Sequence, residues 1–341
     1  MNKPFYLGID IGGTKCAVIA GTGKMKILEK ISFPTETQKG PDYAINLLLK
    51  NASEIIEKLG HKRLKAIGIS CGGPLDSKKG IVQSPPNLPG WDNVHIVKRF
   101  KDRFHIPVYL QNDANACALA EWKFGAGRGT ENMIFLTFGT GMGGGIIING
   151  KIYSGTNDLA GEVGHVRLAE NGPEAYGKKG SFEGFCSGTG IAITAKKIAE
   201  EKFALNQPVA FCKSKNDIGN LTTKDIADAA FSGDPDAIGI LETAGEFLGR
   251  GLSILIDVLN PQRIVIGSIY ARCRQFIEPA CLSIVRQEAL APASAVCSIV
   301  PAALGEEVGD YASLSVAIIQ SGQAKRLPAG PIKEEIDYSV E

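Results

Sequence analysis

The stretch Leu7-Gly8-Ile9-Asp10-Ile11-Gly12-Gly13-Thr14-Lys15 decides the fold of this chain. An apolar run over residues 5–11 contains a single acid and ends in a double glycine, and a second apolar run over residues 16–20 follows at once. This pattern predicts a strand, a tight turn and a second strand. A Walker phosphate loop is excluded, because that motif needs Gly-Lys followed by Ser or Thr and then a helix.

The chemistry of this turn suits a phosphate group. Gly12 and Gly13 let the backbone turn sharply and bring bare N–H groups close to a ligand, while Thr14 adds a hydroxyl and Lys15 an ammonium group. Asp10, a lone acid in an apolar strand, would be costly to bury without a cation or hydrogen bonds. Magnesium held through an acid and phosphates is one such partner. The alternative is a β-hairpin turn with an incidental acid.

A second glycine turn lies in the middle of the chain. The segment Gly139-Thr140-Gly141-Met142-Gly143-Gly144-Gly145 separates predicted strands at 133–138 and 146–148. It matches GxGxxG, but a dinucleotide fingerprint must open a helix, and here a β-branched run and an Asn149-Gly150 hairpin signal follow. We expect the two glycine turns to bind one polyphosphate from opposite domains. Their similarity also hints at an ancient duplication.

Composition limits the class of protein. The chain has 341 residues, 44% hydrophobic and 21% charged, which suits one or two globular domains. A net charge of +1 argues against a nucleic-acid or membrane-binding face. Neither a membrane-length apolar stretch nor a signal-peptide pattern is present. Eight cysteines without a CxxC pair are read as reduced thiols, so we expect a cytoplasmic protein.

Polar residues gather where a short strand at 108–110 gives way to a helix at 114–124. The sequence there is Gln111-Asn112-Asp113-Ala114-Asn115, and ligands of open α/β sheets collect at the carboxyl ends of strands. An N-terminal position on the helix favours the carboxylate of Asp113. An Asx N-cap is the alternative, but it explains one of these residues rather than three. The proline-rich loop at 84–91 either crosses the surface or uses Asn87 and Trp91 to wall a pocket.

A third polar group follows the second turn. Glu162 and His165 lie in Gly161-Glu162-Val163-Gly164-His165, and Glu183 lies just before Ser187-Gly188-Thr189-Gly190, where a helix begins. Isolated polar side chains among small residues are what a pocket for a hydroxylated ligand requires. A lone histidine can equally be structural.

The predicted elements suggest two α/β domains at 1–124 and 125–305, with a helix at 306–320 completing the first and a loose tail at 321–341. We predict helices and strands from periodicity, caps and breakers. The predicted helices are at 42–59, 94–104, 114–124, 222–231, 234–259, 270–288 and 306–319, and further strands are at 24–33, 64–70, 263–267 and 296–300.

Five motifs in this order resemble the ROK family of bacterial sugar kinases and repressors, within the superfamily of actin, sugar kinases and heat-shock chaperone ATPases. They are Asp10-Ile-Gly-Gly-Thr-Lys15, Gln-Asn-Asp-Ala-Asn115, Phe-Gly-Thr-Gly-Met-Gly-Gly144, Gly-Glu-Val-Gly-His165 and Asn-Pro-Gln-Arg-Ile-Val-Ile-Gly267. The resemblance covers about residues 5–320. It implies an α/β fold of two ribonuclease-H-like (actin-like ATPase) domains with a central cleft that closes over the ligands.

The resemblance also implies roles for individual residues. Asp113 would be the general base, taking the proton of a sugar hydroxyl as it attacks phosphorus. Sugar hydroxyls would be bound by Gly73, Asn87, Asn112, Asp113, Glu162, His165 and Glu183. ATP with Mg²⁺ would be bound by Asp10, Gly12, Gly13, Thr14, Lys15, Gly139, Thr140, Gly141, Gly143, Gly188, Gly267 and Ser268, the last three near the adenosine.

The sequence departs from the family in three places. Most members carry a zinc site after the histidine, with the pattern Cys-x-Cys-Gly-x-x-Gly-Cys-x-Glu. Here Glu174, Tyr176 and Ser181 stand at the cysteine positions, and a single histidine cannot hold a tetrahedral structural zinc, so we predict no zinc and a loop ordered by packing. Gly267-Ser268 replaces the usual Gly-Gly, and the tail after residue 320 is longer than usual.

The implied function is phosphorylation of a hexose by ATP, with glucose at its 6-hydroxyl as the first expectation. N-acetylmannosamine, N-acetylglucosamine, fructose, mannose and allose remain open. A repressor of this family would carry a helix-turn-helix domain before the first turn, and a sugar sensor would be expected to lack Asp113 or a phosphate turn. A chaperone-like or polymerising ATPase would lack the Glu162, His165 and Glu183 group. We expect sugar and ATP as partners, no nucleic acid or membrane, and a homo-oligomer, as the dimers or tetramers of relatives suggest.

Overall fold

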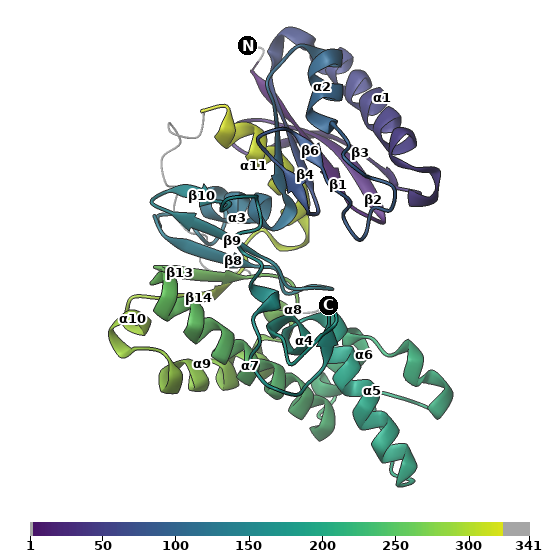
Figure 1. Ribbon diagram of the computed structural model, residues 1–341, viewed down its shortest axis with the longest axis vertical. Coiled ribbons are helices and arrows are strands. Elements are labelled where there is room, and N and C mark those ends of the chain that lie inside the picture. Colours follow the sequence, from purple (N-terminus) through teal and green to yellow (C-terminus); the bar gives the residue numbers. More distant parts are fainter. Residues whose placement is uncertain (1–2, 323–341) are drawn as a thin grey trace. The chain divides into compact units, whose positions relative to one another are not determined.

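A computed structural model describes residues 3–322 (Figure 1). Of the predicted tail at 321–341, residues 323–341 lie outside the described part of the chain. Within residues 3–322, no helix is both long and apolar enough to cross a lipid bilayer. The contacts divide the chain into two compact units. The first contains the described residues up to Glu131, Gly145–Ala160, and those from Ala303 onward; the second contains Asn132–Gly144 and Gly161–Ala302.

The sheet of the first unit has the strand order β3-β2-β1-β4-β7. Its strands are β1 (Phe5–Ile11), β2 (Lys15–Gly21), β3 (Ile27–Pro34), β4 (Leu64–Cys71) and β7 (Val108–Asn112). The first three form an antiparallel meander, and β4 and β7 then run parallel to β1. Because β1, β4 and β7 are parallel, their carboxyl ends meet at one edge, and the first glycine turn and the Asn112-Asp113 pair lie there.

Side-chain alternation along β1 separates the two faces of this sheet. Phe5, Leu7 and Ile9 pack into a core with α1 (Pro41–Leu59) and α2 (Ile96–Phe104). Tyr6 points to the other face, where it packs against α11 (Val308–Gln320). Figure 1 shows α1 and α2 on one side of the sheet and α11, near the carboxyl end of the described chain, on the other. Successive strand side chains point to opposite faces, so the nearly all-apolar β1 matches burial on both sides.

Two glycines let α11 lie close to the sheet. A Cβ at Gly8 in β1 would lie 2.3 Å from the Ser313 hydroxyl, and one at Gly68 in β4 would lie 2.3 Å from the Ser313 carbonyl oxygen. Any larger residue would push the helix away. Asp10 shares this face with Gly8, and a Cβ added at Gly309 would lie 3.4 Å from its carboxylate, so the start of α11 lies beside this acid.

The second sheet repeats the topology of the first. Its order is β10-β9-β8-β13-β14, formed by β8 (Met133–Leu136), β9 (Gly144–Ile148), β10 (Lys151–Tyr153), β13 (Arg263–Ile266) and β14 (Ser298–Pro301). Strand β13 runs parallel to both β8 and β14, and β10 is antiparallel to β9. Asn149 and Gly150 join β9 to β10 with φ values of 50° and 70°, as a type I′ turn requires. The matching order agrees with the duplication that the two glycine turns suggested.

The helices of the second unit largely follow the sequence pattern. Long helix α7 (Pro235–Leu259) begins as predicted at Asp234, whose carboxylate accepts the Ala237 N–H at 2.8 Å. It packs along α9 (Arg274–Glu288) (Figure 1). The remaining helices are α4 (Phe182–Cys186), α5 (Gly188–Ala204), α6 (Thr223–Phe231), α8 (Ile269–Arg272) and α10 (Ala291–Ala295). The single helix predicted at 270–288 is wrong, because the chain breaks at Cys273 between α8 and α9.

Candidate functional site

The first glycine turn presents two free N–H groups. The turn is closed by the Gly12 N–H, which donates to the Lys15 carbonyl at 3.1 Å, and the Thr35 hydroxyl donates to the Gly12 carbonyl at 2.6 Å. Within residues 3–322, the N–H groups of Gly13 and Thr14 donate to no protein acceptor. The side chains of Thr14 and Lys15 are exposed. The turn therefore leaves two backbone donors and two exposed polar side chains available to an anion from solvent.

Asp10 lies under this turn in an unfavourable environment. Burial, together with the nearby carboxylates of Asp310 and Asp113, raises the pKa of the Asp10 carboxyl to about 7, although Lys15 and Lys30 lower it. An acid held in this way at the end of a strand is suited to bind a cation, since a divalent ion would compensate its charge. The donor set therefore fits a magnesium ion that also contacts phosphate. No cluster within residues 3–322 provides three His, Cys, Asp or Glu ligands by itself.

Asp310 is a neighbour that sequence reasoning missed. It lies in the first turn of α11, 8% exposed, and forms an ion pair with Lys30 of β3. The pair brings β3 and α11 together at the side of Asp10. A lone acid at the start of an apolar helix reads as an ordinary N-terminal residue, so only the fold reveals that it faces Asp10.

The polar group at the end of β7 is arranged by a helix cap. The Asn112 side-chain oxygen accepts the N–H groups of Ala114 at 3.0 Å and Asn115 at 3.4 Å, so Asn112 is the N-cap of α3 (Asp113–Phe124). The Gln111 side chain in turn accepts the Asn112 N–H at 2.9 Å and an Asn115 amide hydrogen at 3.2 Å. The N-cap alternative therefore accounts for the Asn112 oxygen. The Asn112 amide nitrogen lies beside Gly73, where an added Cβ would be 3.1 Å from it.

Asp113 is the first residue of α3, and its side chain is exposed. One carboxylate oxygen accepts the Ala114 N–H at 2.8 Å. The surrounding protein nevertheless desolvates the group and raises the pKa of Asp113 above its ordinary value, more than the Ala114 hydrogen bond lowers it. An accessible carboxylate with a raised pKa is better matched to accepting a proton near neutral pH than an ordinary one. The sequence-predicted base thus has suitable access and electrostatics.

The proline-rich loop contributes Asn87 but not Trp91. A Cβ on Gly13 would lie 2.5 Å from the Asn87 carbonyl oxygen, and one on Gly72 would lie 3.3 Å from the Asn87 side-chain oxygen. Asn87 is therefore wedged between the first glycine turn and the Gly72-Gly73 turn. Trp91 is 0% exposed and packs in the core under α1 and α2. The option that Trp91 walls a ligand pocket is wrong, because its indole fills the hydrophobic core.

The second glycine turn is more tightly pinned. The Thr137 hydroxyl accepts the Gly143 N–H at 2.7 Å, the Thr137 N–H donates to the Gly143 carbonyl at 2.9 Å, and the Gly139 N–H donates to the Gly141 carbonyl at 3.2 Å. In the described part of the chain, the N–H groups of Thr140 and Gly141 have no protein acceptor. This turn, like the first, leaves two consecutive donors available.

Glu183 connects the second turn to the predicted sugar residues of its unit. One of its carboxylate oxygens accepts the Met142 N–H at 2.8 Å. Cβ atoms added to Gly141 and Gly164 would lie 3.0 and 3.2 Å from the Glu183 side chain. At Gly164 a Cβ would also lie 2.4 Å from the Met142 carbonyl oxygen, so glycine is needed there, and Glu183 has a structural role besides the predicted contact with sugar.

The three residues predicted near adenosine lie together. The Gly188 N–H at the start of α5 donates to the Gly139 carbonyl at 2.7 Å. The Gly267 N–H donates to the Leu136 carbonyl at 3.0 Å, and the Ile269 N–H donates to the Phe138 carbonyl at 2.9 Å. A Cβ on Gly188 would lie 3.2 Å from the Ile269 side chain. Ser268, exposed between these contacts, has a φ of 51°, which favours glycine.

Glu162 and His165 lie on one short helical turn at 163–165. The His165 N–H donates to the Glu162 carbonyl at 3.2 Å, and both side chains are exposed. None of the three residues at the family's cysteine positions offers a thiolate to a zinc ion. Ser181 uses its hydroxyl to accept the Gly184 N–H at 3.1 Å as the N-cap of α4, and Tyr176 is a poor zinc donor. His165 and Glu174 would leave two ligands where a structural zinc needs four.

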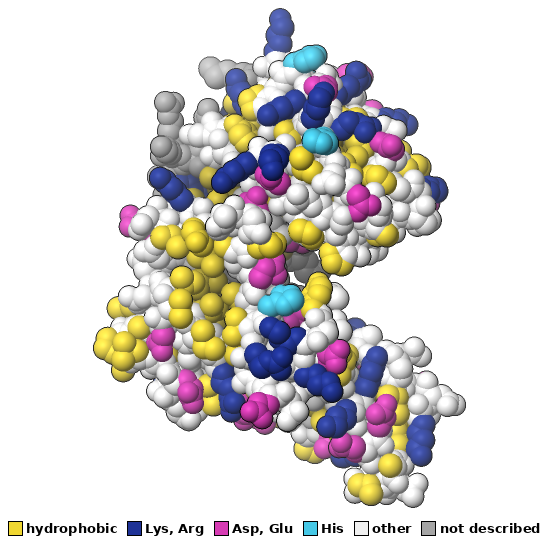
Figure 2. Space-filling model, viewed as in Figure 1, with side chains coloured by type: hydrophobic (Ala, Val, Ile, Leu, Met, Phe, Trp, Pro, Cys, Tyr) yellow, Lys and Arg dark blue, Asp and Glu magenta, His cyan; other side chains and the backbone are white. Residues whose placement is uncertain are grey.

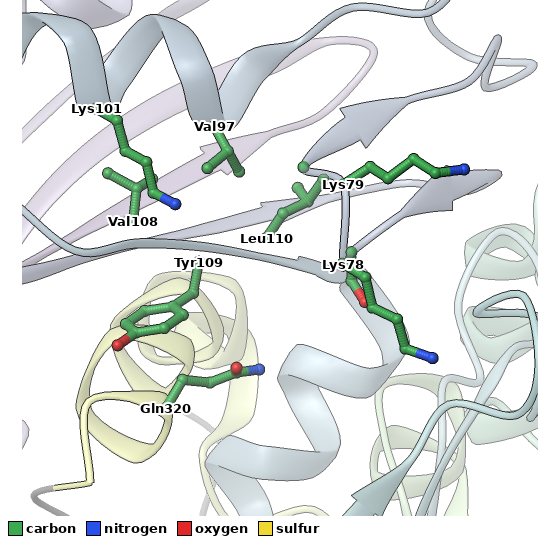
Figure 3. Close-up of a pocket in the computed structure, with 10 residues that line it drawn as sticks. Lys78, Lys79, Val97, Lys101, Val108, Tyr109, Leu110 and Gln320 are labelled. Atoms are coloured by element: carbon green, nitrogen blue, oxygen red, sulfur yellow. The ribbon is translucent and has the colours of Figure 1, made fainter.

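A cavity of about 280 Å³ in the first unit contains none of the predicted site residues (Figure 3). It is lined by side chains that include Lys101 of α2, Tyr109 of β7 and Gln320 of α11. Lys78 and Lys79 extend away from Lys101 (Figure 3), and Lys79 pairs with Asp76 at 3.1 Å. This cavity is therefore separate from the glycine turns and gives no information about what they bind.

Two sheets of the same order, each with an N–H-presenting glycine turn after its first strand, define the actin-like ATPase class of α/β proteins. The chain belongs to the ROK family, whose family model matches residues 6–316. It is 35% identical to a glucokinase of Halalkalibacterium halodurans over 276 residues, covering 78% of this chain and 81% of that protein. It is 32% identical to a Thermotoga maritima glucokinase over 278 residues, covering 81% of this chain and 86% of the relative.

The fold agrees with a solved structure of the same family. The crystal structure of a ROK family glucokinase from Streptomyces griseus, in complex with glucose and AMPPNP, superposes with a TM-score of 0.74. The two proteins are 28% identical, and the match covers 92% of this chain and 99% of the other.

Proposed function

We propose that this protein is an ATP-dependent hexose kinase that transfers the terminal phosphoryl group of ATP to the 6-hydroxyl of glucose. The observation that carries the proposal is the juxtaposition of three features in the first unit. A turn with two free N–H groups, an acid suited to a cation and an accessible carboxylate with a raised pKa lie at one edge of the sheet. The glucokinase relatives support glucose as the acceptor.

In the first unit, phosphoryl transfer needs charge neutralisation and a base. We propose that Gly13 and Thr14 donate N–H groups to phosphate, with Lys15 adding a positive charge. Asp10 would hold a magnesium ion, which neutralises phosphate charge when bound. Asp113 would accept the proton of the sugar hydroxyl as the new P–O bond forms. Gly73, Asn87 and Asn112 are proposed sugar contacts.

In the second unit, the free N–H groups of Thr140 and Gly141 are proposed to bind phosphate, with Gly139 and Gly143 shaping the turn. Gly188, Gly267 and Ser268 would contact the adenosine, since they lie together beside the start of α5. Glu162, His165 and Glu183 would bind sugar hydroxyls. Glu183 could do so with the oxygen that is not bonded to the Met142 N–H.

The base assignment is tested by Asp113→Asn. The amide is nearly isosteric but cannot take the proton, so we expect turnover to fall about 10³-fold, within the range for loss of a general base. Binding of glucose, measured by isothermal calorimetry, should change less than about threefold, a fraction of one hydrogen bond. Asp102→Asn is the control, because this exposed acid of α2 pairs with Lys98 on the same helix. Near-normal turnover of Asp113→Asn would refute the role of Asp113.

The acceptor is identified by a panel of hexoses in a coupled assay of ADP release. Glucose is expected to give the highest kcat/KM among glucose, mannose, allose, fructose, N-acetylglucosamine and N-acetylmannosamine. A higher value for an N-acetylated hexosamine would move the assignment to that class of kinase. ADP release that no sugar stimulates would favour an ATPase with another function.

We also propose that the protein forms a homo-oligomer. Figure 2 shows hydrophobic side chains exposed over the part of the second unit that carries α9 and α10 in Figure 1. Exposed apolar side chains of α7 and of the segment around α10 are Ile254, Val258, Leu290 and Val296. Light scattering coupled to size exclusion would test the proposal, and a mass of 36.2 kDa at micromolar concentration would contradict it.

A further inference from the structure

The loop after His165 is ordered by a small hairpin. Strands β11 (Glu174–Ala175) and β12 (Lys178–Lys179) pair in antiparallel register, and Tyr176-Gly177 connects them. The hairpin is fastened to the segment after His165 by backbone hydrogen bonds. The Leu168 N–H donates to the Gly180 carbonyl and the Phe182 N–H donates to the Val166 carbonyl, both at 2.8 Å. The loop therefore reaches a defined structure through main-chain bonds, without the family's cysteines.

Tyr176 occupies an unusual position in this hairpin. Its φ is 50° and that of Gly177 is 66°, as in a type I′ turn, whose first central position prefers Asn, Asp or Gly. An aromatic residue with positive φ is disfavoured. The side chain is also 67% exposed, so burial of apolar surface does not explain its presence.

The ring of Tyr176 packs against His165. The centroids of the two rings are 5.2 Å apart, and their planes are inclined by 39°. Lys178, two residues further on, donates from its ammonium group to the His165 carbonyl at 2.7 Å. One hairpin thus restrains both the imidazole and the backbone of the same histidine.

We infer that Tyr176 is a positioning residue that fixes the His165 imidazole for the sugar, at a place where this chain lacks the three cysteines of the family's zinc site. The inference rests on the proposed sugar-binding role of His165. An imidazole that contributes one hydrogen bond is most effective when its orientation is set before the ligand arrives. The Tyr176 ring limits rotation of the His165 imidazole, although its positive φ is less favourable for tyrosine than for asparagine. This restraint on His165 explains why a tyrosine stands at the turn.

Three variants separate the ring from the turn. Tyr176→Asn removes the ring but suits the positive φ, so it should retain the thermal stability of the parent. Tyr176→Phe retains the ring and loses only the hydroxyl. His165→Ala removes the positioned group. We expect Tyr176→Asn to raise KM for glucose about fivefold, as expected for weakening one hydrogen bond. Its kcat and its KM for ATP should stay within twofold, and Tyr176→Phe, which keeps the ring, should have a KM for glucose closer to that of the parent than Tyr176→Asn has.

An NMR measurement reads the positioning without activity. The chain has only four histidines, so a histidine-labelled sample gives a simple imidazole spectrum, and His165→Ala assigns the His165 signal. A ring-current shift should move that signal in the parent and in Tyr176→Phe, and should vanish in Tyr176→Asn. If the signal is unchanged in Tyr176→Asn, the inference is wrong.

The sugar-binding role of His165 and the positioning of His165 by Tyr176 can be disproved independently. If His165→Ala leaves KM for glucose unchanged, the sugar role of His165 is wrong, and so is the claim that Tyr176 serves sugar binding, even if the NMR signal moves. Metal analysis of the purified protein provides a further check. Stoichiometric zinc that is lost on chelation together with the His165 shift would show that a metal, rather than Tyr176, fixes this histidine.

Discussion

The two glycine turns share a backbone device but differ in their charges. After β1, the free N–H groups are those of Gly13 and Thr14, and after β8 they are those of Thr140 and Gly141. The first turn is flanked by Asp10 and Lys15, whereas residues 137–145 contain no charged side chain. The only carboxylate bonded to the second turn belongs, among the described residues, to Glu183 from α4.

This difference suggests a division of labour between two copies of one structural motif. A glycine turn alone supplies N–H donors to an anion, and both copies retain that property. Cation binding and proton transfer need carboxylates with perturbed pKa values, and these are found around the first turn. The repeated topology therefore conserves a scaffold, whereas among the described residues Asp10 and Asp113 lie in the first unit, so we expect the proposed chemistry to depend on that unit.

Asp10→Asn should produce the largest effect that tests this difference. Loss of the proposed magnesium ligand is expected to reduce turnover about 100-fold, equivalent to roughly 3 kcal/mol of transition-state stabilisation. The fall should be partly reversed by raising the magnesium concentration, because the phosphates of ATP would still bind the ion. The measurement is kcat as a function of total magnesium at saturating ATP and glucose.

The same variant should be more stable than the parent at neutral pH. The pKa of Asp10 is raised to about 7 in the folded protein, against 3.8 ordinarily, so the folded state binds the proton more tightly. The parent is therefore expected to lose stability as the pH rises from about 4 to about 7. Asp10→Asn avoids this loss and should gain on the order of 4 kcal/mol at pH 8, and nothing below pH 4.

Denaturant unfolding at pH 4 and pH 8 without magnesium measures the gain. Asp76→Asn is the matched control, because hydrogen bonds from Lys79 lower the pKa of Asp76. Removal of that acid should not stabilise the protein at pH 8. If Asp10→Asn is no more stable than the parent at pH 8, the protein itself offsets the cost of the buried Asp10 charge, and no metal is needed to do so.

Substitution of one glycine in each turn is expected to have an intermediate effect. A Cβ on Gly13 would lie 2.5 Å from the Asn87 carbonyl oxygen, whereas one on Gly139 would meet no atom within 4 Å. Gly13→Ala must therefore move the turn or the proline-rich loop. We expect a rise of about tenfold in KM for ATP, equal to roughly 1.4 kcal/mol, and a lower melting temperature.

Gly139→Ala serves as the matched variant. It should leave the melting temperature unchanged, because its methyl group enters open space in the free protein. A rise in KM for ATP without loss of stability would support phosphate binding at the second turn. If Gly139→Ala binds ATP like the parent, the second turn does not closely approach the nucleotide, and the proposed pairing of the two turns fails.

Much of the fold could be predicted from local sequence signals. The apolar runs of β1 and β8 and the glycines after them indicated both hairpins, and Asp234-Pro235 located the start of α7. The break at Cys273 was missed, because residues 270–288 carry a continuous helical pattern and no proline or glycine marks the junction. That break depends on tertiary packing around α8, which periodicity does not encode.

The candidate site was predictable where a motif contains its own chemistry. Asp10 and Asp113 stood out as acids beside glycine or amide residues at strand ends. Asp310 did not, because its importance comes from packing of α11 against β1, far away in sequence. Trp91 was open to misinterpretation, since an indole in a proline-rich loop suits either a core or a pocket wall. Contacts between segments far apart in the chain could not be predicted from this one sequence.

The smallest expected effect is on stability, and it comes from the residues that follow β4 and β13, the strands parallel to β1 and β8. Strand β4 is followed by Gly72-Gly73, and the equivalent strand β13 is followed by Gly267-Ser268. Ser268 has φ 51° and ψ −109°, a conformation that glycine adopts without strain. Ser268→Gly should relieve that strain, and after the greater chain entropy of glycine is subtracted, the net gain is about 0.5–1 kcal/mol.

Thermal unfolding of the second unit measures this gain as a rise of about 2 °C in melting temperature. Ser268→Ala separates strain from hydrogen bonding, because it keeps the Cβ but removes the hydroxyl that accepts from Arg272 at 3.1 Å. We expect Ser268→Ala to be no more stable than the parent. If both variants are equally stabilised, the serine hydroxyl rather than the backbone is the unfavourable group, and the difference between the two strand ends has no conformational cause.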